Sequence, residues 1–394
     1  MTDAPIVGVI GGGQLARMMI PAALSLGIEL RVLAENDGTP AGIAATAVGD
    51  YRDADDVLRF ADTVDVITFD HEHVPQAVLR ELVERGIAVR PGPHALQFAQ
   101  NKLSMRERLG ELGIPMPDWA RVQTAADLTA FLADHGGRAV LKTATGGYDG
   151  KGVRVVSSAD DARDWLDSGD DLLVEELVEF RRELAKMVAR RPSGDMMEWP
   201  VVESVQRNGV CAEVIAPAPR SAGRVADVAS DIARSIAENL DVTGVFAVEL
   251  FETTDDRVLV NELAMRPHNT GHWTIDGSTT SQFEQHLRAV LDLPLGATGC
   301  RDTWSVMINV LGGPQAGSLA DALPAALADQ PMAKVTLYGK EPRPGRKVGH
   351  VTVGGDDLDD VVWQARSAAV LLGTDTPLES AVEFPADGGT DGTA

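Results

Sequence analysis

Cysteine, basic residues and long apolar runs are all scarce in this chain of 394 residues. Its two cysteines, Cys211 and Cys300, lie far apart and form no CxxC pair. This excludes a disulfide framework and a cysteine-rich zinc site, and it predicts a reducing compartment. No apolar run approaches the roughly 18 residues of a membrane span, and the N-terminus lacks a basic segment followed by an apolar stretch. We therefore expect a cytoplasmic protein with neither a membrane anchor nor a signal peptide.

The chain has fewer basic than acidic residues. Lys and Arg total 35 against 59 Asp and Glu, which gives a formal net charge of -24. Such an acidic surface argues against nucleic acid or an anionic membrane as the main partner. A phosphorylated substrate would therefore need the few basic residues to be concentrated locally. The composition, 44% hydrophobic, is that of a globular protein, and the length predicts two or three domains.

The first hundred residues read as alternating strands and helices. Strands are expected at residues 5–10, 28–34, 64–69 and 87–89, and helices at 14–26 and 75–85. This β-α-β order predicts a parallel sheet with helices on its faces, an α/β arrangement.

After residue 100 the pattern changes to strands that pair locally. Hairpins are expected between 139–143 and 153–157, 184–190 and 197–205, and 244–252 and 257–263, with helices at 102–112 and 224–240. A third region carries strands near 305–311, 334–338 and 348–353 and a helix at 358–371. We predict domains at 1–100, 101–297 (with a glycine-rich lobe at about 115–180) and 298–384, followed by a disordered tail at 385–394.

A glycine turn follows the first expected strand. The residues Gly-Gly-Gly-Gln-Leu-Ala at 11–16 fit the G-x-G-x-x-A dinucleotide fingerprint, and Glu35 ends the next strand, where a ribose-binding acid would lie. The same glycines serve any tight turn that brings a helix N-terminus near an anion. A nicotinamide dinucleotide and another phosphorylated ligand are both compatible with this turn, and we favour the second.

The strongest local signal is a glycine-rich loop at residues 142–152, which connects two strands. It is not a Walker loop, because that loop runs from a strand to a helix and ends in Gly-Lys-Ser/Thr. Backbone N–H groups and Lys151 could fold over phosphates, with Lys142 as a fixed cation on the preceding strand. A plain surface hairpin is the alternative, but four glycines in seven residues exceed what a hairpin needs.

A pair of carboxylates is expected on the hairpin at 244–263. If Asp255 and Asp256 are the central turn residues, Glu249 lies directly opposite Glu262 on one face, and Asn261 points to the other face. Opposed like charges destabilise a sheet, and a divalent cation such as Mg²⁺ or Mn²⁺ would remove that penalty. A solvated pair or a one-residue register shift is the alternative, which the apolar flanking residues make less plausible.

Polar residues also gather at 266–273, in the segment Arg-Pro-His-Asn-Thr-Gly-His-Trp. Dense planar polar groups suit recognition of a small oxyanion. A zinc site from His268 and His272 is conceivable, but its spacing demands a helix that Pro267 and Gly271 disfavour.

Two other polar clusters complete the candidates. The segment 343–350 is the densest basic cluster. A solvated loop is the alternative, but this is where an anionic substrate would be held against the negative charge of the chain. The residues Asp-His-Glu-His at 70–73 follow a strand end. A metal site from His71 and His73 is possible there, and a substrate contact from Glu72 is favoured.

Six segments together resemble a known family. They are Gly-Gly-Gly-Gln-Leu-Ala-Arg-Met at 11–18, Lys142 with Thr-Gly-Gly-Tyr-Asp-Gly-Lys-Gly at 145–152, Asn-Glu-Leu-Ala at 261–264, His-Asn-Thr-Gly-His-Trp at 268–273, Ser-Gln-Phe-Glu at 281–284 and Arg-Pro-Gly-Arg-Lys-Val-Gly-His at 343–350. The loop and the carboxylates resemble ATP-grasp ligases. The fourth and sixth segments are more specific and resemble the N5-carboxyaminoimidazole ribonucleotide synthetase family of purine biosynthesis, from about Gly8 to His350.

The resemblance implies an ATP-grasp fold, with an N-terminal Rossmann-like domain, a central two-lobed ATP-grasp domain and a small β-rich C-terminal domain. It implies ATP and Mg²⁺ (or Mn²⁺) as cofactors, and a homodimer. The implied ATP contacts are Lys102, Lys142, Gly147, Tyr148, Asp149, Gly150, Lys151, Gly152, Val153, Glu175, Glu176, Leu177, Val178, Glu183, Gln206, Asn261 and Glu262. Glu175, Glu176 and Val178 would form the adenine hinge, Glu183 would bind the ribose, and Glu249 and Glu262 would hold the metal.

The resemblance also implies the reaction, in which ATP phosphorylates bicarbonate and the amine of aminoimidazole ribonucleotide captures the activated carbon. The implied ribonucleotide contacts are Gln14, Leu15, Glu72, Lys151, Arg346 and Lys347. The implied catalytic residues are Arg266, His268 and Asn269 for bicarbonate, Asp149 for the amine proton, and Lys347 for the intermediate.

Some residues depart from the family pattern. Ala264 replaces a metal-binding Asn of many ATP-grasp enzymes, as it does throughout this family, and Asp70-His71 replaces a Glu followed by an apolar residue. The alternatives are an ATP-grasp ligase for another carboxylate or amine, a nicotinamide oxidoreductase and an inactive binding protein. The last is disfavoured because Lys142, Asp149 and the carboxylate pair are all present.

Overall fold

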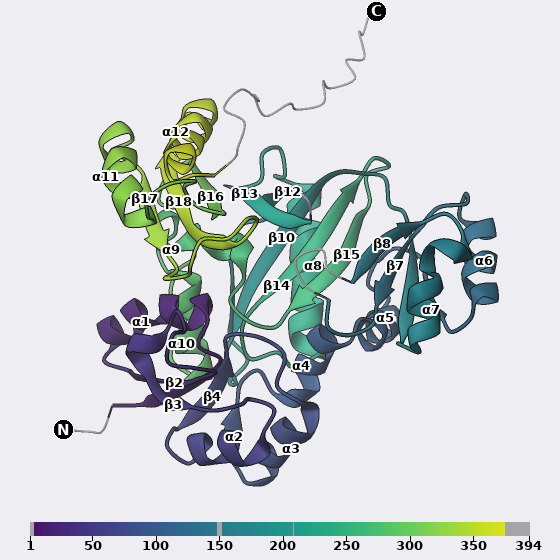
Figure 1. Ribbon diagram of the computed structural model, residues 1–394, viewed down its shortest axis with the longest axis horizontal. Coiled ribbons are helices and arrows are strands. Elements are labelled where there is room, and N and C mark those ends of the chain that lie inside the picture. Colours follow the sequence, from purple (N-terminus) through teal and green to yellow (C-terminus); the bar gives the residue numbers. More distant parts are fainter. Residues whose placement is uncertain (1–3, 148–151, 208, 375–394) are drawn as a thin grey trace, which may run out of the picture.

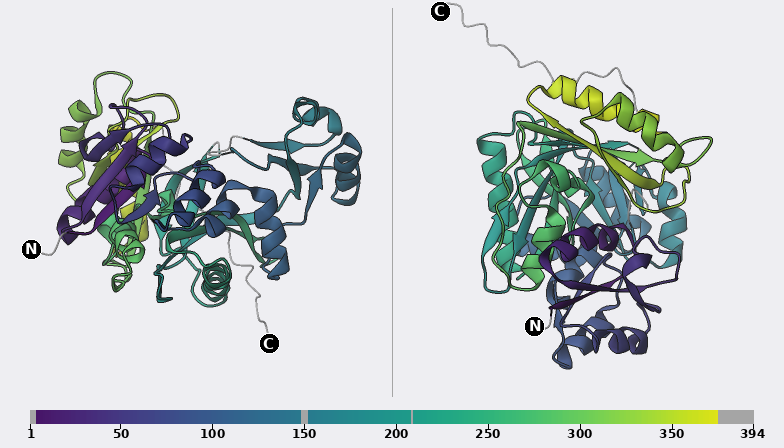
Figure 2. Two further views of the ribbon diagram at one scale, coloured as in Figure 1. Left: turned by 90° about the horizontal axis from the view of Figure 1, so that it is seen from below. Right: turned by 90° about the vertical axis from the view of Figure 1, so that its left-hand side faces the viewer.

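The computed structural model describes residues 4–147, 152–207 and 209–374. Figures 1 and 2 show a parallel sheet near the N-terminus, a long central sheet that reaches into the C-terminal region, and a smaller lobe that projects to one side. Among the described residues, no helix has the length and apolar character that crossing a membrane requires. The predicted tail at 385–394 lies outside the described residues.

The N-terminal sheet is parallel throughout, in the order β3-β2-β1-β4-β5. Its strands are β1 Ile6–Ile10, β2 Glu29–Ala34, β3 Ala45–Val48, β4 Val66–Phe69 and β5 Ala88–Val89. Its helices are α1 Gln14–Leu26, α2 Ala54–Ala61, α3 Gln76–Glu84 and α4 Pro93–Gln100, and a 3-10 turn spans Gly42–Ala44. The predicted strands and the helix at 14–26 are confirmed, but the short edge strand β3 was not anticipated.

The projecting lobe is an antiparallel sheet in the order β6-β9-β7-β8. Its strands are β6 Trp119–Val122, β7 Ala139–Thr143, β8 Val153–Val156 and β9 Leu172–Glu176, with helices α6 Ala125–Asp134 and α7 Arg163–Ser168 and a 3-10 turn at Ala159–Ala162. Helix α5, Lys102–Glu111, leads into it. The pairing of β7 with β8 confirms the hairpin that carries the glycine-rich loop.

The central sheet runs in the order β15-β14-β10-β12-β13-β16-β18-β17, with β11 paired to β10. Its strands are β10 Phe180–Arg190, β11 Met196–Glu198, β12 Val202–Arg207, β13 Val210–Ala216, β14 Gly244–Thr253, β15 Val258–Ala264, β16 Trp304–Leu311, β17 Lys334–Leu337 and β18 Lys347–Gly355. Because β13 pairs with β16, the sheet continues across the expected domain boundary near residue 298. The single strand expected at 197–205 is wrong, since it is interrupted between β11 and β12 around Pro200, which has no backbone N–H to donate.

Different helices pack on the two faces of the central sheet. Helix α8, Arg224–Asn239, packs on the back of β10, β14 and β15, and helices α11 Leu319–Asp329 and α12 Leu358–Leu371 pack on the back of β16 and β18. The front carries a 3-10 turn at Asn269–Gly271 and helices α9 Thr274–Gly277 and α10 Gln282–Val290. Helix α10 also packs against α1, so it joins the central sheet to the N-terminal sheet.

A buried histidine on α10 holds this junction. The Nδ1 atom of His286 accepts a hydrogen bond from the backbone N–H of Val245 at 3.0 Å, and its Nε2 lies 2.7 Å from Thr68 Oγ1. Since Nδ1 is an acceptor, the neutral ring carries its proton on Nε2 and donates it to Thr68. Burial lowers the pKa of His286 to about 3.

We expect this histidine to make the protein sensitive to acid. Its pKa is depressed in the folded state, so its stabilising contribution is complete above about pH 6.5 and is lost as the pH falls toward 3. The loss reaches about 3 kcal/mol at pH 4. Urea unfolding at pH 7, 6, 5 and 4 should show a weaker pH dependence for His286→Asn than for the wild type. Parallel curves for the wild type and His286→Asn would contradict this assignment.

Candidate active site

Two buried lysines meet at the junction of the lobe and the central sheet. Lys142 projects from β7, and its Nζ lies 2.6 Å from Glu175 Oε2 and 3.2 Å from Asn261 Oδ1. Lys102 begins α5, and its Nζ lies 2.6 Å from Glu262 Oε1. The side chains predicted to bind phosphates therefore come together from different elements of the fold.

Glu175 is tied to cations rather than left free. Its carboxylate lies 2.6 Å from Arg106 Nε and 2.6 Å from Lys142 Nζ. Burial alone would raise the pKa of Glu175, but Lys142 and Arg106 outweigh it and lower the value to about 2. The side chain therefore positions Lys142, and only the backbone of Glu175 remains for the predicted adenine hinge. Next in that hinge, Glu176 is partly buried and accepts a hydrogen bond from the backbone of Asp118, whereas Leu177 is exposed.

Arg106 is a residue that the sequence did not reveal. It is fully buried, and besides Glu175 it donates hydrogen bonds to the carbonyl oxygens of Val260 and Asn261. It thus connects α5, β9 and β15. Its partners lie 69 to 155 positions away along the chain, so no local pattern could have identified them.

The expected carboxylate pair is confirmed by the strand register, in which Glu249 lies opposite Glu262. The reasoning behind it needs correction at two points. Thr253 N–H donates to Arg257 O at 2.9 Å, and Asp256 has a φ of 65°, so the turn has three central residues rather than two. A β-bulge between Glu249 and Leu250 then restores the predicted pairing.

The extra residue of that bulge is Asn261. The expectation that its side chain points away from the site is wrong, because a bulge interrupts the alternation of side chains along a strand. Its Oδ1 accepts a hydrogen bond from Lys142, so it lies with the predicted nucleotide contacts.

Glu249 sits in an electropositive setting. Its Oε1 lies 3.1 Å from His268 Nε2. Burial opposes the ionisation of Glu249, but the contact with His268 and the charges of Lys347 and Arg266 outweigh it, and its pKa lies below the ordinary value. With Asn261 and Glu262 beside it, the donor set is oxygen only, which fits Mg²⁺ or Mn²⁺. Within the described residues, no group of three or more His, Cys, Asp or Glu side chains forms a ready-made metal site.

Glu183 lies on the same face of the sheet as Glu249, since Ala185 is opposite Glu249 and side chains alternate along β10. Burial and the neighbouring charge of Glu249 raise the pKa of Glu183 to about 7, despite a hydrogen bond with Gln206. The two predicted nucleotide contacts, Glu183 and Gln206, are therefore adjacent.

The glycine-rich loop is described only at its ends. Gly152 has a φ of 71°, and a Cβ atom there would lie 2.5 Å from Thr143 Oγ1, so a side chain at this position would be strained. Val153 is exposed at the start of β8, and Gly147 precedes the gap in the description. The predicted contacts Tyr148, Asp149, Gly150 and Lys151 lie outside the described residues.

Two N–H groups at the first glycine turn already have carboxylate acceptors. Asp70 Oδ1 accepts from Ala16 N at 2.8 Å, and Glu35 Oε2 accepts from Gly12 N at 3.1 Å. Contact with His71 and the N–H of Gly12 outweigh burial and lower the pKa of Glu35 to about 2. These carboxylates take donors that a pyrophosphate would need, which counts against the dinucleotide alternative.

The predicted ribonucleotide contacts Gln14 and Leu15 begin α1. Leu15 is buried, whereas Gln14 reaches across to the C-terminal region, where its Oε1 accepts from Lys340 Nζ at 2.7 Å. Lys340 is a further residue that the sequence reasoning missed, although it lies only three positions before the basic cluster. In that cluster, Arg346 donates to the carbonyl of Glu341, and Lys347 begins β18.

Glu72 joins the N-terminal sheet to the segment that follows β15. Its Oε2 accepts from Arg266 Nε at 2.6 Å, and its Oε1 accepts from the backbone of Met265 at 3.2 Å. Burial opposes ionisation, but Arg266 more than compensates and lowers the pKa of Glu72. In this structure the carboxylate therefore orients Arg266.

Asn269 makes a reciprocal amide pair with Asn309 of β16. Asn269 Nδ2 lies 3.1 Å from Asn309 Oδ1, and Asn309 Nδ2 lies 2.6 Å from Asn269 Oδ1. Both side chains are buried. This pair anchors the 268–273 segment to the central sheet, a role that the sequence alone did not indicate.

The histidines of both metal alternatives contact other protein groups. His71 Nδ1 accepts from the backbone N–H of His73, and its Nε2 lies 3.4 Å from Glu35 Oε1. His268 and His272 flank a 3-10 turn and face different partners, Glu249 and the side chains of Gln14 and Gln282.

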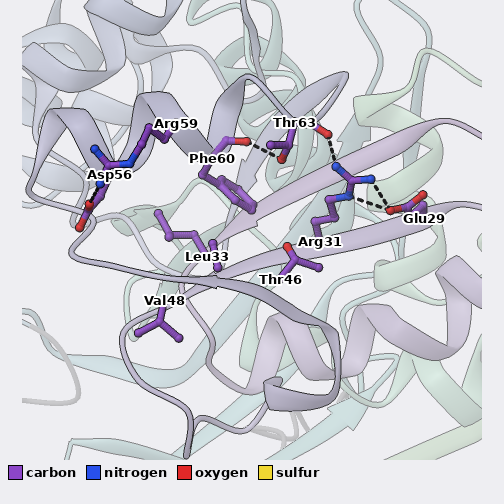
Figure 3. Close-up of a pocket in the computed structure, with 10 residues that line it drawn as sticks. Glu29, Arg31, Leu33, Thr46, Val48, Asp56, Arg59, Phe60 and Thr63 are labelled. Carbon is purple, nitrogen blue, oxygen red and sulfur yellow. Dashed lines mark hydrogen bonds and ion pairs between the residues drawn. The ribbon is translucent and has the colours of Figure 1, made fainter.

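A surface groove beside β2, β3 and α2 lies elsewhere on the N-terminal sheet (Figure 3). Its charged side chains satisfy one another, since Arg31 pairs with Glu29 and Thr63 O, and Arg59 pairs with Asp56. None of the residues that line the groove belongs to the cluster of lysines and carboxylates described above.

Comparison with known proteins agrees with this geometry. Three family models match successive parts of the chain, namely a ribonucleotide synthetase preATP-grasp domain at 5–100, an ATP-grasp domain at 107–283 and a phosphoribosylaminoimidazole carboxylase C-terminal domain at 305–364. The fold and the paired lysines and carboxylates define the chain as an ATP-grasp ligase.

Individual relatives indicate which family of ATP-grasp ligases the chain resembles. The N5-carboxyaminoimidazole ribonucleotide synthase of Mycobacterium tuberculosis (strain H37Rv) is 49% identical, covering 94% of this chain and 88% of its own length, and that of Corynebacterium ammoniagenes is 48% identical, covering 93% and 92%. The structure of the Aspergillus clavatus synthase in complex with ADP and 5-aminoimidazole ribonucleotide matches with a TM-score of 0.85 at 33% identity, covering 94% of this chain and 99% of that one. The chain belongs to the N5-carboxyaminoimidazole ribonucleotide synthase family.

Proposed function

We propose that this chain carboxylates 5-aminoimidazole ribonucleotide to N5-carboxyaminoimidazole ribonucleotide, consuming ATP and bicarbonate and releasing ADP and phosphate. The observation that carries the proposal is the opposed pair Glu249 and Glu262, with Lys102 on one carboxylate and His268 on the other. It supports the proposal because a candidate phosphate-binding lysine and a candidate bicarbonate-binding histidine contact neighbouring carboxylates.

The first step joins bicarbonate to phosphate. A bicarbonate oxygen attacks the γ-phosphorus of ATP, the bond to the β-phosphate oxygen breaks, and ADP leaves. Lys102 and Lys142 would bind the phosphate oxygens, and Glu249 and Glu262 would hold Mg²⁺ or Mn²⁺. The metal would supply positive charge to the phosphates during transfer.

The second step forms the carbon–nitrogen bond. The exocyclic amine of the ribonucleotide attacks the carbon of carboxyphosphate, or CO₂ released from it, and phosphate departs. We assign the amine proton to Asp149 and bicarbonate positioning to Arg266 and His268. Since the amide of Asn269 is paired with Asn309, we now assign Asn269 to holding the segment rather than to contacting bicarbonate.

The ribonucleotide is proposed to lie between the N-terminal sheet and the start of β18. Gln14 and Lys340 meet there at 2.7 Å, and the charges of Lys347 and Arg266 both act on Glu249 and on His272. Arg346 and Lys347 would bind the ribonucleotide phosphate, and Lys151 would close from the glycine-rich loop. A cytoplasmic location, which the composition predicts, and a homodimer, which the family resemblance implies, belong to the same proposal.

Release of ADP under substrate omission tests the function. Purified protein with Mg-ATP should release ADP only when bicarbonate and the ribonucleotide are both present, in step with consumption of the ribonucleotide. If ADP release does not depend on the ribonucleotide, the protein is an ATP-grasp ligase that acts on a different amine.

Lys347→Met should reduce the kcat of ribonucleotide carboxylation by about 100-fold or more, because one preorganised charge at a reacting centre contributes on the order of 3 kcal/mol. ATP binding should be nearly unchanged, since Lys102 and Lys142 are retained. Steady-state kinetics and nucleotide titration measure the two effects. Arg343→Met, in the same basic cluster, is the matched control and should stay within about threefold of the wild type. Equal activity of Lys347→Met and the control would remove Lys347 from the mechanism.

A further inference from the structure

Helix α10 begins with a glutamine that the proposed mechanism has not used. Ser281 caps the helix by accepting a hydrogen bond from Glu284 N, and Gln282 is its first residue. The Gln282 side chain is fully buried, and its backbone N–H donates to Thr274 Oγ1 at 2.8 Å. Its carboxamide points into the segment that carries His268 and His272.

The orientation of this carboxamide follows from two backbone groups. The N–H of His268 donates to Gln282 Oε1 at 2.8 Å, and Gln282 Nε2 donates to the carbonyl of the same residue at 2.8 Å. A backbone N–H can only donate and a carbonyl can only accept. The oxygen and nitrogen of Gln282 are thereby distinguished without reference to any other side chain.

This orientation decides the tautomer of a neighbouring histidine. The Nε2 atom of Gln282 also lies 2.8 Å from His272 Nδ1. Because that amide nitrogen is a donor, Nδ1 must be the acceptor, and the neutral His272 ring carries its proton on Nε2. Burial keeps the pKa of His272 well below the ordinary value, in agreement with a neutral ring.

The two histidines face opposite sides of the site. His272 Nε2 lies 3.3 Å from Nε2 of Gln14, the predicted ribonucleotide contact, whose Oε1 accepts from Lys340. Both atoms are donors in the assigned tautomer, and this longer contact is outweighed by the 2.8 Å contact of Gln282 with His272 Nδ1. His268 Nε2 lies 3.1 Å from Glu249, the predicted metal ligand. One carboxamide therefore fixes the backbone of His268 and the ring of His272 at the same time.

We propose that Gln282 is a positioning residue of the carboxylation reaction, which sets His268 against the bicarbonate side and fixes His272 as the Nε2–H tautomer toward the ribonucleotide side. The expected effect of Gln282 on kcat rests on the proposed function, whereas the tautomer of His272 can be measured in a protein that shows no turnover. No contact of Gln282 with a reacting atom is required.

The same helix offers a matched control in Gln285, one turn further on. It is also fully buried, and it makes the same double contact with a backbone, accepting from Gly296 N at 2.8 Å and donating to Gly296 O at 2.7 Å. Gly296 lies in a loop away from the lysines and carboxylates. A purely structural role for buried glutamines on α10 should therefore affect both positions equally.

Kinetics of Gln282→Met and Gln285→Met make the first comparison. We expect Gln282→Met to lower kcat by about 100-fold, because small misplacement of reacting groups has effects of that size. The affinity for ATP should be unchanged, and Gln285→Met should keep kcat within about threefold. In a His268→Ala background, Gln282→Met should lower kcat by a smaller factor than in the wild type, because the positioning of His268 is already lost and only that of His272 remains to be disturbed. Equal losses at the two glutamines, or additive losses with His268→Ala, would overturn the proposal.

Nitrogen-15 NMR of the histidine rings makes the second comparison and needs no turnover. The wild type and Gln285→Met should show His272 as the Nε2–H tautomer. Gln282→Glu keeps an acceptor for His268 N–H but turns an acceptor toward His272 Nδ1, so it should shift the proton to Nδ1. This variant also carries the test if Gln282→Met does not fold. A Nε2–H signal that persists in Gln282→Glu overturns the proposal, whereas the expected shift in an enzyme without ribonucleotide-dependent ADP release would refute only the proposed function.

Discussion

Turnover should fall by at least about 1000-fold when Glu262 is replaced with glutamine. The substitution keeps the size and one oxygen of the side chain but removes a charge that a divalent cation needs from its ligands. It also removes the partner of Lys102, which lies 2.6 Å away. Because the Glu262 side chain is 40% exposed, the free energy of unfolding should change by no more than about 1 kcal/mol.

The measurement for Glu262→Gln is the rate of ADP release in saturating Mg²⁺, together with a denaturation curve that confirms folding. Asp255→Asn, in the turn of the same hairpin, is the control. Its carboxylate pairs with Arg257 on the surface and should be dispensable. A near-normal rate for Glu262→Gln would contradict the assignment of the β14–β15 carboxylates to the metal.

The largest effect on stability is expected for Arg106→Met. This arginine is fully buried and donates to Glu175 and to the carbonyls of Val260 and Asn261. Removing one member of a buried ion pair leaves a charge without compensation and costs about 3–5 kcal/mol. ATP affinity should also fall, because Lys142 would then be the main partner of Glu175.

Urea denaturation tests the Arg106 prediction. The double variant Arg106→Met with Glu175→Gln should recover part of the lost stability, since the unpaired carboxylate is then absent. Arg108→Met, on the same helix and at its surface, should change stability by less than about 1 kcal/mol. An Arg106→Met protein as stable as Arg108→Met would show that the buried network is not a main support of the lobe junction.

The parts of the site that the sequence predicted are those governed by short-range patterns. The opposition of Glu249 and Glu262 follows from alternation along two strands joined by a short turn. Even there, the agreement depended on two irregularities that cancel, a three-residue turn and a bulge at Asn261. The sequence indicated neither the length of the turn nor the position of the bulge.

The residues that sequence reasoning missed make contacts over long distances along the chain. Arg106 lies in a helix whose charged neighbours suggest a solvated surface, and Asn309 lies in an apolar strand. The role of Gln282 depends on the 268–272 segment folding back onto α10. Such contacts depend on how sheets and helices pack, which periodicity and spacing do not encode.

The glycine turn shows the opposite case, in which a strong local pattern suggested a ligand that the packing does not favour. Its fingerprint suited a dinucleotide as well as another phosphorylated ligand. In the structure, Asp70 and Glu35 accept the N–H groups of Ala16 and Gly12. A tight turn needs the same glycines whether its partner is a phosphate or a carboxylate.

Transfer of oxygen from bicarbonate to phosphate tests the central claim most directly. The protein would be incubated with Mg-ATP, the ribonucleotide and ¹⁸O-labelled bicarbonate, and the released phosphate analysed by mass spectrometry. Phosphorylation of bicarbonate predicts one labelled oxygen in each phosphate, formed in step with consumption of the ribonucleotide. Unlabelled phosphate would mean that water attacks ATP, and it would contradict the proposed activation of bicarbonate at this site.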